Sequence, residues 1–285
     1  MPRSDALSDH AGCTEEHDIH GMRHARASHA IFRRVQEVTP ARIAAPRFPL
    51  ALPLLRDDVH VVQFPLDSYG DMADLAPMVD DEERHRMARL VRESHRRRFM
   101  VAHALTRLVL GRCLQVSPAS LRFGIGPHGK PRLTGARLDL RFNLSHAGER
   151  ALLAVAIGRE LGVDIEKERR VDVLGIARRY FSPSEYLALA SLPEDHRVGA
   201  FCRCWTRKES FLKARGEGLA FPLSGFEVSL AETAPQLLVA CARAPTELDR
   251  WTMVSVAVDP GYAGAITAEG QGWRLTCWDS PVHGQ

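Results

Sequence analysis

At 285 residues with a hydrophobic fraction of 45%, the chain is long enough to bury one large core or two modest ones. The formal net charge of only +3 gives no overall field that would favour nucleic acid or a membrane surface, so any anion-binding site has to be local. Six cysteines without a CxxC pair, and a start without an apolar signal segment, predict a soluble cytoplasmic protein.

The first 40 residues are polar and rich in small side chains, with histidines and Cys13 scattered at no regular spacing. Such a stretch has no periodic apolar face that would dock on a core, so we predict that residues 1–40 form a disordered extension. An apolar run over residues 43–55 is too short to span a bilayer and is interrupted by prolines. We interpret this run as an extended arm, and we expect no membrane contact.

Apolar residues recur with helical spacing among arginines over residues 94–114, which predicts an amphipathic helix. Short β-prone runs follow, and a second series of helix and strands comes after residue 198. The predicted strands are 121–124, 140–144, 151–157, 161–165, 226–230, 253–258 and 263–267, and the second helix is 198–214. The repeated order predicts an α+β fold with two pseudo-duplicated α/β halves in one chain, residues 41–158 and 159–285. We expect a ligand site in the cleft between the halves.

Residues 162–166 (GVDIE) place two carboxylates at alternate positions near a predicted strand end. Alternation along a strand directs Asp164 and Glu166 to one face and Ile165 to the other. Two carboxylates on one face repel each other unless a cation lies between them. The alternative is a solvated strand end, whose charge is balanced by Lys167 and Arg169.

Residues 205–213 (WTRKESFLK) lie in the second predicted helix, where Trp205, Glu209 and Lys213 recur every four residues and share a face. That face equally suits a tryptophan packed in the core beside a surface ion pair worth about 0.3–0.5 kcal/mol. Two shorter segments also leave alternatives open. His146 in residues 142–146 (FNLSH) suits either a phosphate or a neighbouring carbonyl, and residues 129–131 (GKP) alone predict an ordinary turn.

Taken together and in this order, GKP, FNLSH, GVDIE and WTRKESFLK are far more specific than any one of them. The set resembles the Sfp-type 4'-phosphopantetheinyl transferases over about residues 80–267, including residues 180–186 (YFSPSEY), 216–219 (GEGL) and 259–262 (DPGY). The resemblance implies the fold of that family and a magnesium-dependent transfer of 4'-phosphopantetheine from coenzyme A to a serine of an apo acyl or peptidyl carrier protein, releasing 3',5'-ADP. It also implies a monomer that activates carriers of fatty-acid, polyketide or nonribosomal peptide synthesis.

The resemblance further implies roles for individual residues. Three carboxylates bind Mg²⁺, namely Asp164, Glu166 and Glu209. Coenzyme A is held by four groups of residues. Lys208 and Lys213 bind the diphosphate, Ser145 and His146 lie near the 3'-phosphoadenosine end, and Lys130 and Pro131 border the adenine. Arg98 binds the 3'-phosphate, with Arg84 or Arg86 as an additional phosphate contact. The base that activates the carrier serine is either Glu209 or a water held by Glu166. Lys213 assists the leaving phosphate as a point charge.

Two rival interpretations compete with this one. The small holo-acyl-carrier-protein synthases resemble one half of the fold and assemble as trimers, which a chain carrying both halves does not need. An arginine-rich binding module over residues 84–112 is disfavoured, because acidic side chains alternate with the arginines and no aromatic platform for stacking bases is present. We therefore expect no nucleic-acid partner.

Overall fold

The computed structural model describes residues 54–69, 72–126, 128–218, 221–234, 236–241 and 244–279, all within one compact unit that spans residues 36–285. The predicted disordered extension, residues 1–40, lies outside the described residues, as does nearly all of the predicted arm. None of the helices in these ranges is both long and apolar enough to cross a lipid bilayer.

Helices and strands alternate irregularly along the chain. The helices are α1 (Asp81–Ala88), α2 (Glu93–Leu114), α3 (Val173–Tyr180), α4 (Pro183–Ala190), α5 (Glu194–Arg215) and α6 (Glu247–Arg250). The strands are β1 (Asp58–Pro65), β2 (Arg122–Ile125), β3 (Pro131–Thr134), β4 (Leu140–Ala147), β5 (Arg150–Ile157), β6 (Leu161–Lys167), β7 (Phe226–Val228), β8 (Leu238–Cys241), β9 (Trp251–Ser255), β10 (Tyr262–Glu269) and β11 (Arg274–Asp279). The predicted α+β class is confirmed, and every predicted element has a counterpart. The last predicted strands shift, since β9 begins two residues before the predicted start and ends at Ser255.

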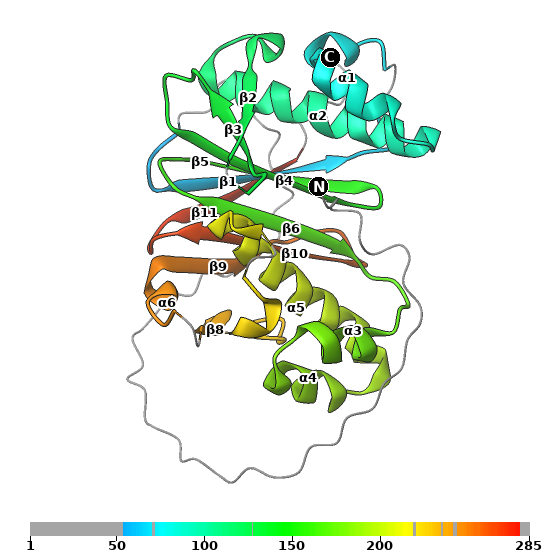
Figure 1. Cartoon of the computed structure of the whole chain (residues 1–285), viewed down its shortest axis with the longest axis vertical. Helices are drawn as coiled ribbons and strands as arrows, with labels where there is room; N and C mark the ends of the chain where they lie inside the picture. Colours follow the sequence, from blue (N-terminus) through cyan, green and yellow to red (C-terminus); the bar gives the residue numbers. More distant parts are fainter. Residues whose placement is uncertain are drawn as a thin grey trace. The chain divides into compact units, whose positions relative to one another are not determined.

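Two sheets form the centre of the fold, one with the order β11-β1-β5-β4 and one with the order β6-β10-β9. Figure 1 shows α2 on the outer side of the first sheet and α5 on the outer side of the second. Alternate residues of β1 explain the layering: Val62 and Phe64 pack in the cluster with α2, while Val59 and Val61 pack in the cluster between the sheets. Each long helix therefore covers one sheet, as a pseudo-duplicated fold predicts.

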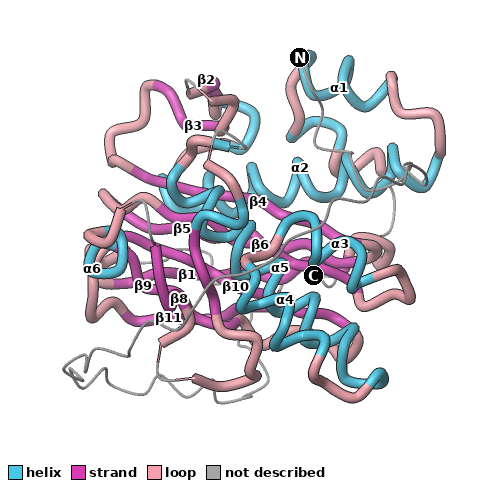
Figure 2. Tube along the Cα trace, turned by 60° about the horizontal axis from the view of Figure 1, so that its bottom comes forward, coloured by secondary structure: helices cyan, strands magenta, loops and turns pink. Residues whose placement is uncertain are grey.

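A third apolar cluster lies around α5 on its side away from the first sheet. It gathers side chains of α3, α4, β7, β8 and β9. Figure 2 shows α3, α4 and α5 side by side, in agreement with their mutual contacts. Phe181, Phe201 and Trp205 pack against one another within this cluster at centroid separations of 5.3 to 6.2 Å. The tryptophan of the second motif is therefore a core side chain.

The last strand crosses from one half of the chain to the sheet of the other. β11 pairs in parallel with β1, from Asp58 opposite Arg274 to Gln63 opposite Asp279. The Arg274 guanidinium also donates to the Asp58 carboxylate at 2.8 Å, across 216 residues of sequence. The predicted division at residues 158 and 159 does not anticipate this crossing, because periodicity reveals strands but not their partners.

A buried polar network joins α1 to α2. Asp80 caps α1 and forms a capping box with Glu83, whose side chain returns to the Asp80 amide at 3.0 Å. Arg107, fully buried in α2, donates to Glu83 at 2.7 Å and also contacts Asp80, while His103 lies 2.8 Å from Glu83. Burial raises the pKa of Glu83, but the hydrogen bonds from His103 and the Asp80 amide and the positive charges nearby outweigh it and bring the pKa down to about 2.

We expect this network to make the free energy of unfolding decrease at low pH. Because the pKa of Glu83 is lower in the folded chain than its ordinary value of 4.5, its contribution is present above that value and is lost as the pH falls towards 2. The loss should amount to about 3 kcal/mol, measured as a shift of the urea midpoint across this window. Glu83→Gln should start less stable and show a shallower slope, whereas equal slopes for both proteins would contradict the assignment.

Candidate functional site

The contact between α5 and β6 is unusually close because of one glycine. A Cβ atom at Gly162 would lie 2.2 Å from the Ala214 amide nitrogen and 2.3 Å from the Ser210 carbonyl oxygen. Only a residue without a side chain lets the helix backbone rest on the strand at this point. The close approach carries Glu209 and Lys213 of the helix over the strand positions that follow Gly162.

Three side chains meet directly at this contact. The Lys213 ammonium donates to Asp164 Oδ1 at 2.6 Å and to the Ser145 hydroxyl at 3.0 Å. Ser145 in turn donates to the same Asp164 oxygen at 2.8 Å. The residues come from α5, β6 and β4, so both halves of the chain contribute to one cluster. The family resemblance implied that Ser145 lies near the 3'-phosphoadenosine end of the ligand. The structure places it beside Asp164.

One carboxylate oxygen of Asp164 has no hydrogen-bond partner among the described residues. The residue is only 3% exposed, and the oxygen in question, Oδ2, is buried. An unpaired buried carboxylate oxygen is costly, since it has lost water and gained nothing in exchange. It is therefore positioned to accept a ligand or a cation.

The two neighbouring glutamates are half-buried, and their pKa values are raised. Burial is the larger cause for both, and the negative charge of Asp164 is the second. Together they raise the pKa of Glu209 to about 7, against the opposing charge of Lys213. Glu166 shifts in the same direction, with Glu209 adding to the effect and Arg169 opposing it. Asp164, Glu166 and Glu209 thus form one electrostatic group.

The donors in this group suit a hard cation. In the described part of the chain, no set of three or more His, Cys, Asp or Glu side chains lies close enough to qualify as a metal site. Even so, all three side chains here are carboxylates, the buried Oδ2 of Asp164 lacks a partner, and the pKa values of Glu166 and Glu209 are raised by burial and then by the charge of Asp164. Oxygen donors of this kind are those that Mg²⁺ prefers. The residues present therefore fit such an ion.

Asn143 holds the two sheets in place beside the cluster. Its buried side-chain oxygen accepts a hydrogen bond of 2.9 Å from the backbone amide of Val163, next to Asp164. The bond joins the edge strand β4 to the edge strand β6 although they belong to different sheets. The motif FNLSH gives Asn143 no role by itself, because only the fold shows which strand its side chain faces.

The remaining residues predicted for the 3'-phosphoadenosine end do not join the carboxylate cluster. His146 follows Ser145 on β4 and is exposed, because consecutive residues of a strand point to opposite faces. Arg98 donates to both oxygens of Asp67 at 2.8 and 2.7 Å. Arg86 lies on α1, with its guanidinium 5.9 Å from the ring centre of Phe99.

Lys208 does not lie at the diphosphate position that the family resemblance implies. The residue is fully buried, and its ammonium donates to the carbonyl oxygens of Leu223 and Phe226, each at 2.7 Å. It also forms an ion pair of 2.8 Å with buried Glu185. The reason is helical geometry, since one residue turns the helix by about 100° and so directs Lys208 away from the face of Glu209 and Lys213. Lys208 holds the region after α5 in place and is not available to a ligand.

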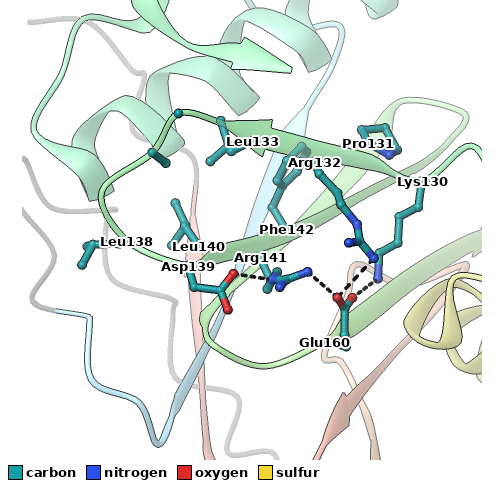
Figure 3. Close-up of a pocket in the computed structure, with 12 residues that line it drawn as sticks. Lys130, Pro131, Arg132, Leu133, Leu138, Asp139, Leu140, Arg141, Phe142 and Glu160 are labelled. Atoms are coloured by element: carbon teal, nitrogen blue, oxygen red, sulfur yellow. Dashed lines mark hydrogen bonds and ion pairs between the residues drawn. The ribbon is translucent and has the colours of Figure 1, made fainter. Parts of the chain in front are cut away.

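Lys130 and Pro131 border a cavity of about 360 Å³ near the start of β4 (Figure 3). The Lys130 ammonium donates to Glu160, to the Leu161 carbonyl and to the Ala214 carbonyl at 2.9, 2.8 and 3.3 Å. All three of its protons are thus used within the protein. The aliphatic stem of Lys130 and the ring of Pro131 remain as surfaces that could border a base.

A second link between the halves went unnoticed in the sequence. Glu149, in the turn between β4 and β5, accepts hydrogen bonds from Lys167 of β6 at 2.8 Å and from Tyr262 of β10 at 2.5 Å. Next to it, Arg150 pairs with Asp259 at 2.5 Å. These contacts lie at the same end of β4 and β6 as Ser145 and Glu166, so they fix the edge of the cluster. No local sequence pattern predicts these contacts, because the partners in the Glu149–Tyr262 and Arg150–Asp259 pairs are more than a hundred residues apart.

Comparison with known proteins identifies the family. Residues 160–267 match the 4'-phosphopantetheinyl transferase superfamily, and residues 67–157 match the family described as 4'-phosphopantetheinyl transferase, N-terminal. The chain is 37% identical over 234 residues to the 4'-phosphopantetheinyl transferase HetI of Nostoc sp. (strain PCC 7120), covering 81% of this chain and 95% of that protein. The chain belongs to the 4'-phosphopantetheinyl transferase family.

Other relatives agree with this assignment. The transferase is 31% identical over 190 residues to the 4'-phosphopantetheinyl transferase Sfp of Bacillus subtilis (strain 168), covering 67% of this chain and 82% of that protein. A solved structure, the holo-(acyl-carrier-protein) synthase AcpS of Thermotoga maritima, is 19% identical and covers 40% of this chain and 64% of that one. Its TM-score of 0.30 is too low for the likeness to carry an argument. The predicted enzyme class, a 4'-phosphopantetheinyl transferase, is confirmed.

Proposed function

We propose that this transferase moves the 4'-phosphopantetheine group of coenzyme A to a serine of an apo acyl or peptidyl carrier protein, in a reaction that depends on Mg²⁺. One observation supports the proposal above all. Asp164, Glu166 and Glu209 form one electrostatic group beside Lys213, within the residues that match the transferase superfamily. A cluster with three carboxylates and an ammonium is suited to a cation and a diphosphate at once.

The three carboxylates would hold Mg²⁺, with the partnerless Oδ2 of Asp164 as a donor. Bound there, the ion would neutralise charge on the diphosphate. Lys213 donates to Asp164 in this group, and its side chain is 30% exposed, so it can reach a phosphate oxygen. Lys208 takes no part, since it is committed to Glu185 and to backbone carbonyls.

The reaction needs a base and a stabilised leaving group. The carrier serine oxygen forms a bond to the β-phosphorus of coenzyme A, and the bond from that phosphorus to the oxygen bridging to the α-phosphate breaks, releasing 3',5'-ADP. We assign the serine proton to Glu209, because its carboxylate belongs to the same group as Asp164 and Lys213. Lys213 stabilises the negative charge that develops on the departing phosphate.

The nucleotide end of coenzyme A extends away from this cluster. We assign the adenine to the edge formed by the Lys130 stem and Pro131, beside the cavity. The 3'-phosphate goes to His146 and Arg98, with Arg86 as an additional cation. Arg98 would exchange its bidentate contact with Asp67 for the phosphate.

The enzyme is proposed to act as a cytoplasmic monomer. Asp164, Glu209 and Ser145 come from both halves of one chain, so no second copy is needed to complete the cluster. The five described cysteines are free thiols, as in a reducing compartment. Gel filtration should give a single-chain mass, and a trimer would contradict this part of the proposal.

A direct assay tests the proposed reaction. The purified enzyme is incubated with coenzyme A, MgCl₂ and a panel of apo-carrier proteins from fatty-acid, polyketide and nonribosomal peptide systems. We expect intact mass spectrometry to show the added arm on at least one carrier, with the increase lost when magnesium is replaced by EDTA. No mass increase on any carrier, or an equal increase in EDTA, would refute the corresponding part of the proposal.

We predict that the carrier docks on the arginines that follow Glu166. Four exposed arginines lie in and just before α3, namely Arg169, Arg170, Arg178 and Arg179, and the charge of Arg169 reaches Glu166. Cations beside a reaction site steer an anionic partner towards it. The double variant Arg169→Glu/Arg170→Glu should therefore raise the Michaelis constant for an acidic carrier by about tenfold, and salt should weaken wild-type binding.

The matched control is Arg89→Glu/Arg92→Glu, which reverses two exposed arginines in the turn between α1 and α2. It should change the Michaelis constant by less than about twofold, because exposed charges beyond a screening length act weakly. Equal losses in both double variants would mean that overall charge, not this surface, attracts the carrier. A flat salt profile for the wild type would point to apolar contacts.

A further inference from the structure

Lys213 occupies a specific oxygen of the cluster. Its ammonium lies 2.6 Å from Asp164 Oδ1, and Ser145 bonds both members of that pair. The resulting triangle of short contacts holds the ammonium on a carboxylate that is almost completely buried. The lysine side chain itself is 30% exposed, so the flexible stem has room to move while Asp164 does not.

The ammonium on Oδ1 of Asp164 opposes a divalent ion on the partnerless Oδ2 of the same carboxylate. The positive charge of Lys213 acts on Glu166 and on Glu209 as well as on Asp164, so it already balances part of the acidic group. A divalent ion bound to the same carboxylate would lie within a few ångströms of the ammonium and be repelled by it. Movement of the ammonium away from Asp164 would relieve this repulsion, and the lysine is the cation on a flexible stem.

We infer that Lys213 is an internal competitor of the divalent cation for Asp164, held in that position by Ser145 and released from it when the cation binds. The inference rests on the proposed metal site and adds a second position for the lysine. Once displaced, the ammonium is free for a phosphate oxygen of the ligand. A diphosphate that binds the lysine therefore strengthens cation binding, and by linkage the cation strengthens diphosphate binding to the same extent.

Cation affinity in the absence of coenzyme A tests this directly. Mn²⁺ serves as the probe, with free Mn²⁺ counted by electron paramagnetic resonance in titrations of the full chain. Lys213→Met removes the competitor and should bind Mn²⁺ at least about fivefold more tightly than the wild type, at the lower end of typical couplings between sites. Lys213→Arg keeps a cation at the site and should not show this gain. Circular dichroism checks that each variant is folded, and Lys213→Gln replaces Lys213→Met if the latter does not fold.

Lys167→Met is the matched control. It removes the same charge one residue after Glu166, but its ammonium pairs with Glu149 and not with Asp164. Its Mn²⁺ affinity should stay within about twofold of the wild type, because an exposed charge is screened. Equal gains in Lys167→Met and Lys213→Met would reduce the effect to net charge and overturn the inference.

The coupling gives a second readout. Inorganic pyrophosphate should tighten Mn²⁺ binding to the wild type, after its own complex with Mn²⁺ is subtracted, and should tighten it less in Lys213→Met. Mn²⁺ binding that is present in the wild type but unchanged or weaker in Lys213→Met would overturn the inference while leaving the metal site standing. No Mn²⁺ binding by any variant would instead refute the metal site of the proposed function.

Discussion

Replacing Asp164 or Glu209 with alanine is expected to abolish phosphopantetheine transfer, with turnover falling by about a thousandfold or more. Each change removes a carboxylate donor from the group that would hold Mg²⁺, so the diphosphate is left poorly neutralised. Asp164→Ala also removes the partner of Lys213 and of Ser145. Turnover is measured from the mass increase of the carrier at saturating magnesium.

The fold should survive both substitutions. The pKa of Glu209 is raised by its surroundings, which means that the folded chain disfavours its charge, and alanine removes that cost. Glu194→Ala, at an exposed position of the first turn of α5, is the control and should keep wild-type turnover. Unchanged turnover in Asp164→Ala or in Glu209→Ala would show that the carboxylate in question is not part of the reaction.

Gly162→Ala is the second change with a large expected effect. The added methyl would lie 2.2 and 2.3 Å from two backbone atoms of α5. A backbone atom cannot move away by a change of rotamer, as a side chain can. We expect a loss of about 3 kcal/mol or more in the free energy of unfolding, at the upper end of what overpacking costs. Because α5 carries Glu209 and Lys213, the displaced helix should also lower turnover in whatever protein remains folded. Thermal unfolding and the transfer assay measure the two effects.

Gly199→Ala, in the same helix, provides the matched control. There the added methyl would meet the ends of two flexible side chains, Arg203 and Glu168, each at 3.3 Å. Alanine also has a higher helix propensity than glycine by about 1 kcal/mol. This variant should be as stable as the wild type or more so. If Gly162→Ala proved equally harmless, α5 would not rest on β6 as the structure describes.

Local pattern predicted much of this molecule because its main elements are long and periodic. The two 22-residue helices and the central strands follow from the spacing of apolar residues, and the alternation of residues 162–166 placed Asp164 and Glu166 on one face. The diphosphate role that the family resemblance implied for Lys208 does not fit the fold, in which this lysine is buried against Glu185 and backbone carbonyls. On a helix, adjacent residues diverge by about 100°, whereas residues four apart converge.

Features that depend on distant partners were not predictable from one sequence. Asn143 reaches the backbone of Val163 only because two edge strands of different sheets lie together. Ser145 joins Lys213 across 68 residues for the same reason. The alternation of residues in a strand predicts which of its faces is buried, but it does not predict which other strand will pair with it or lie beside it.

The pairing of β1 with β11 also bears on how the chain is made. Translation delivers β1, β5 and β4 well before residues 274–279, so the outer edge of β1 stays open while the remainder of the polypeptide is synthesised. An exposed edge of that kind is a template for pairing with another chain. The first sheet can therefore be completed only after residues 274–279 have been synthesised, and a truncation upstream of β11 would leave the edge of β1 open.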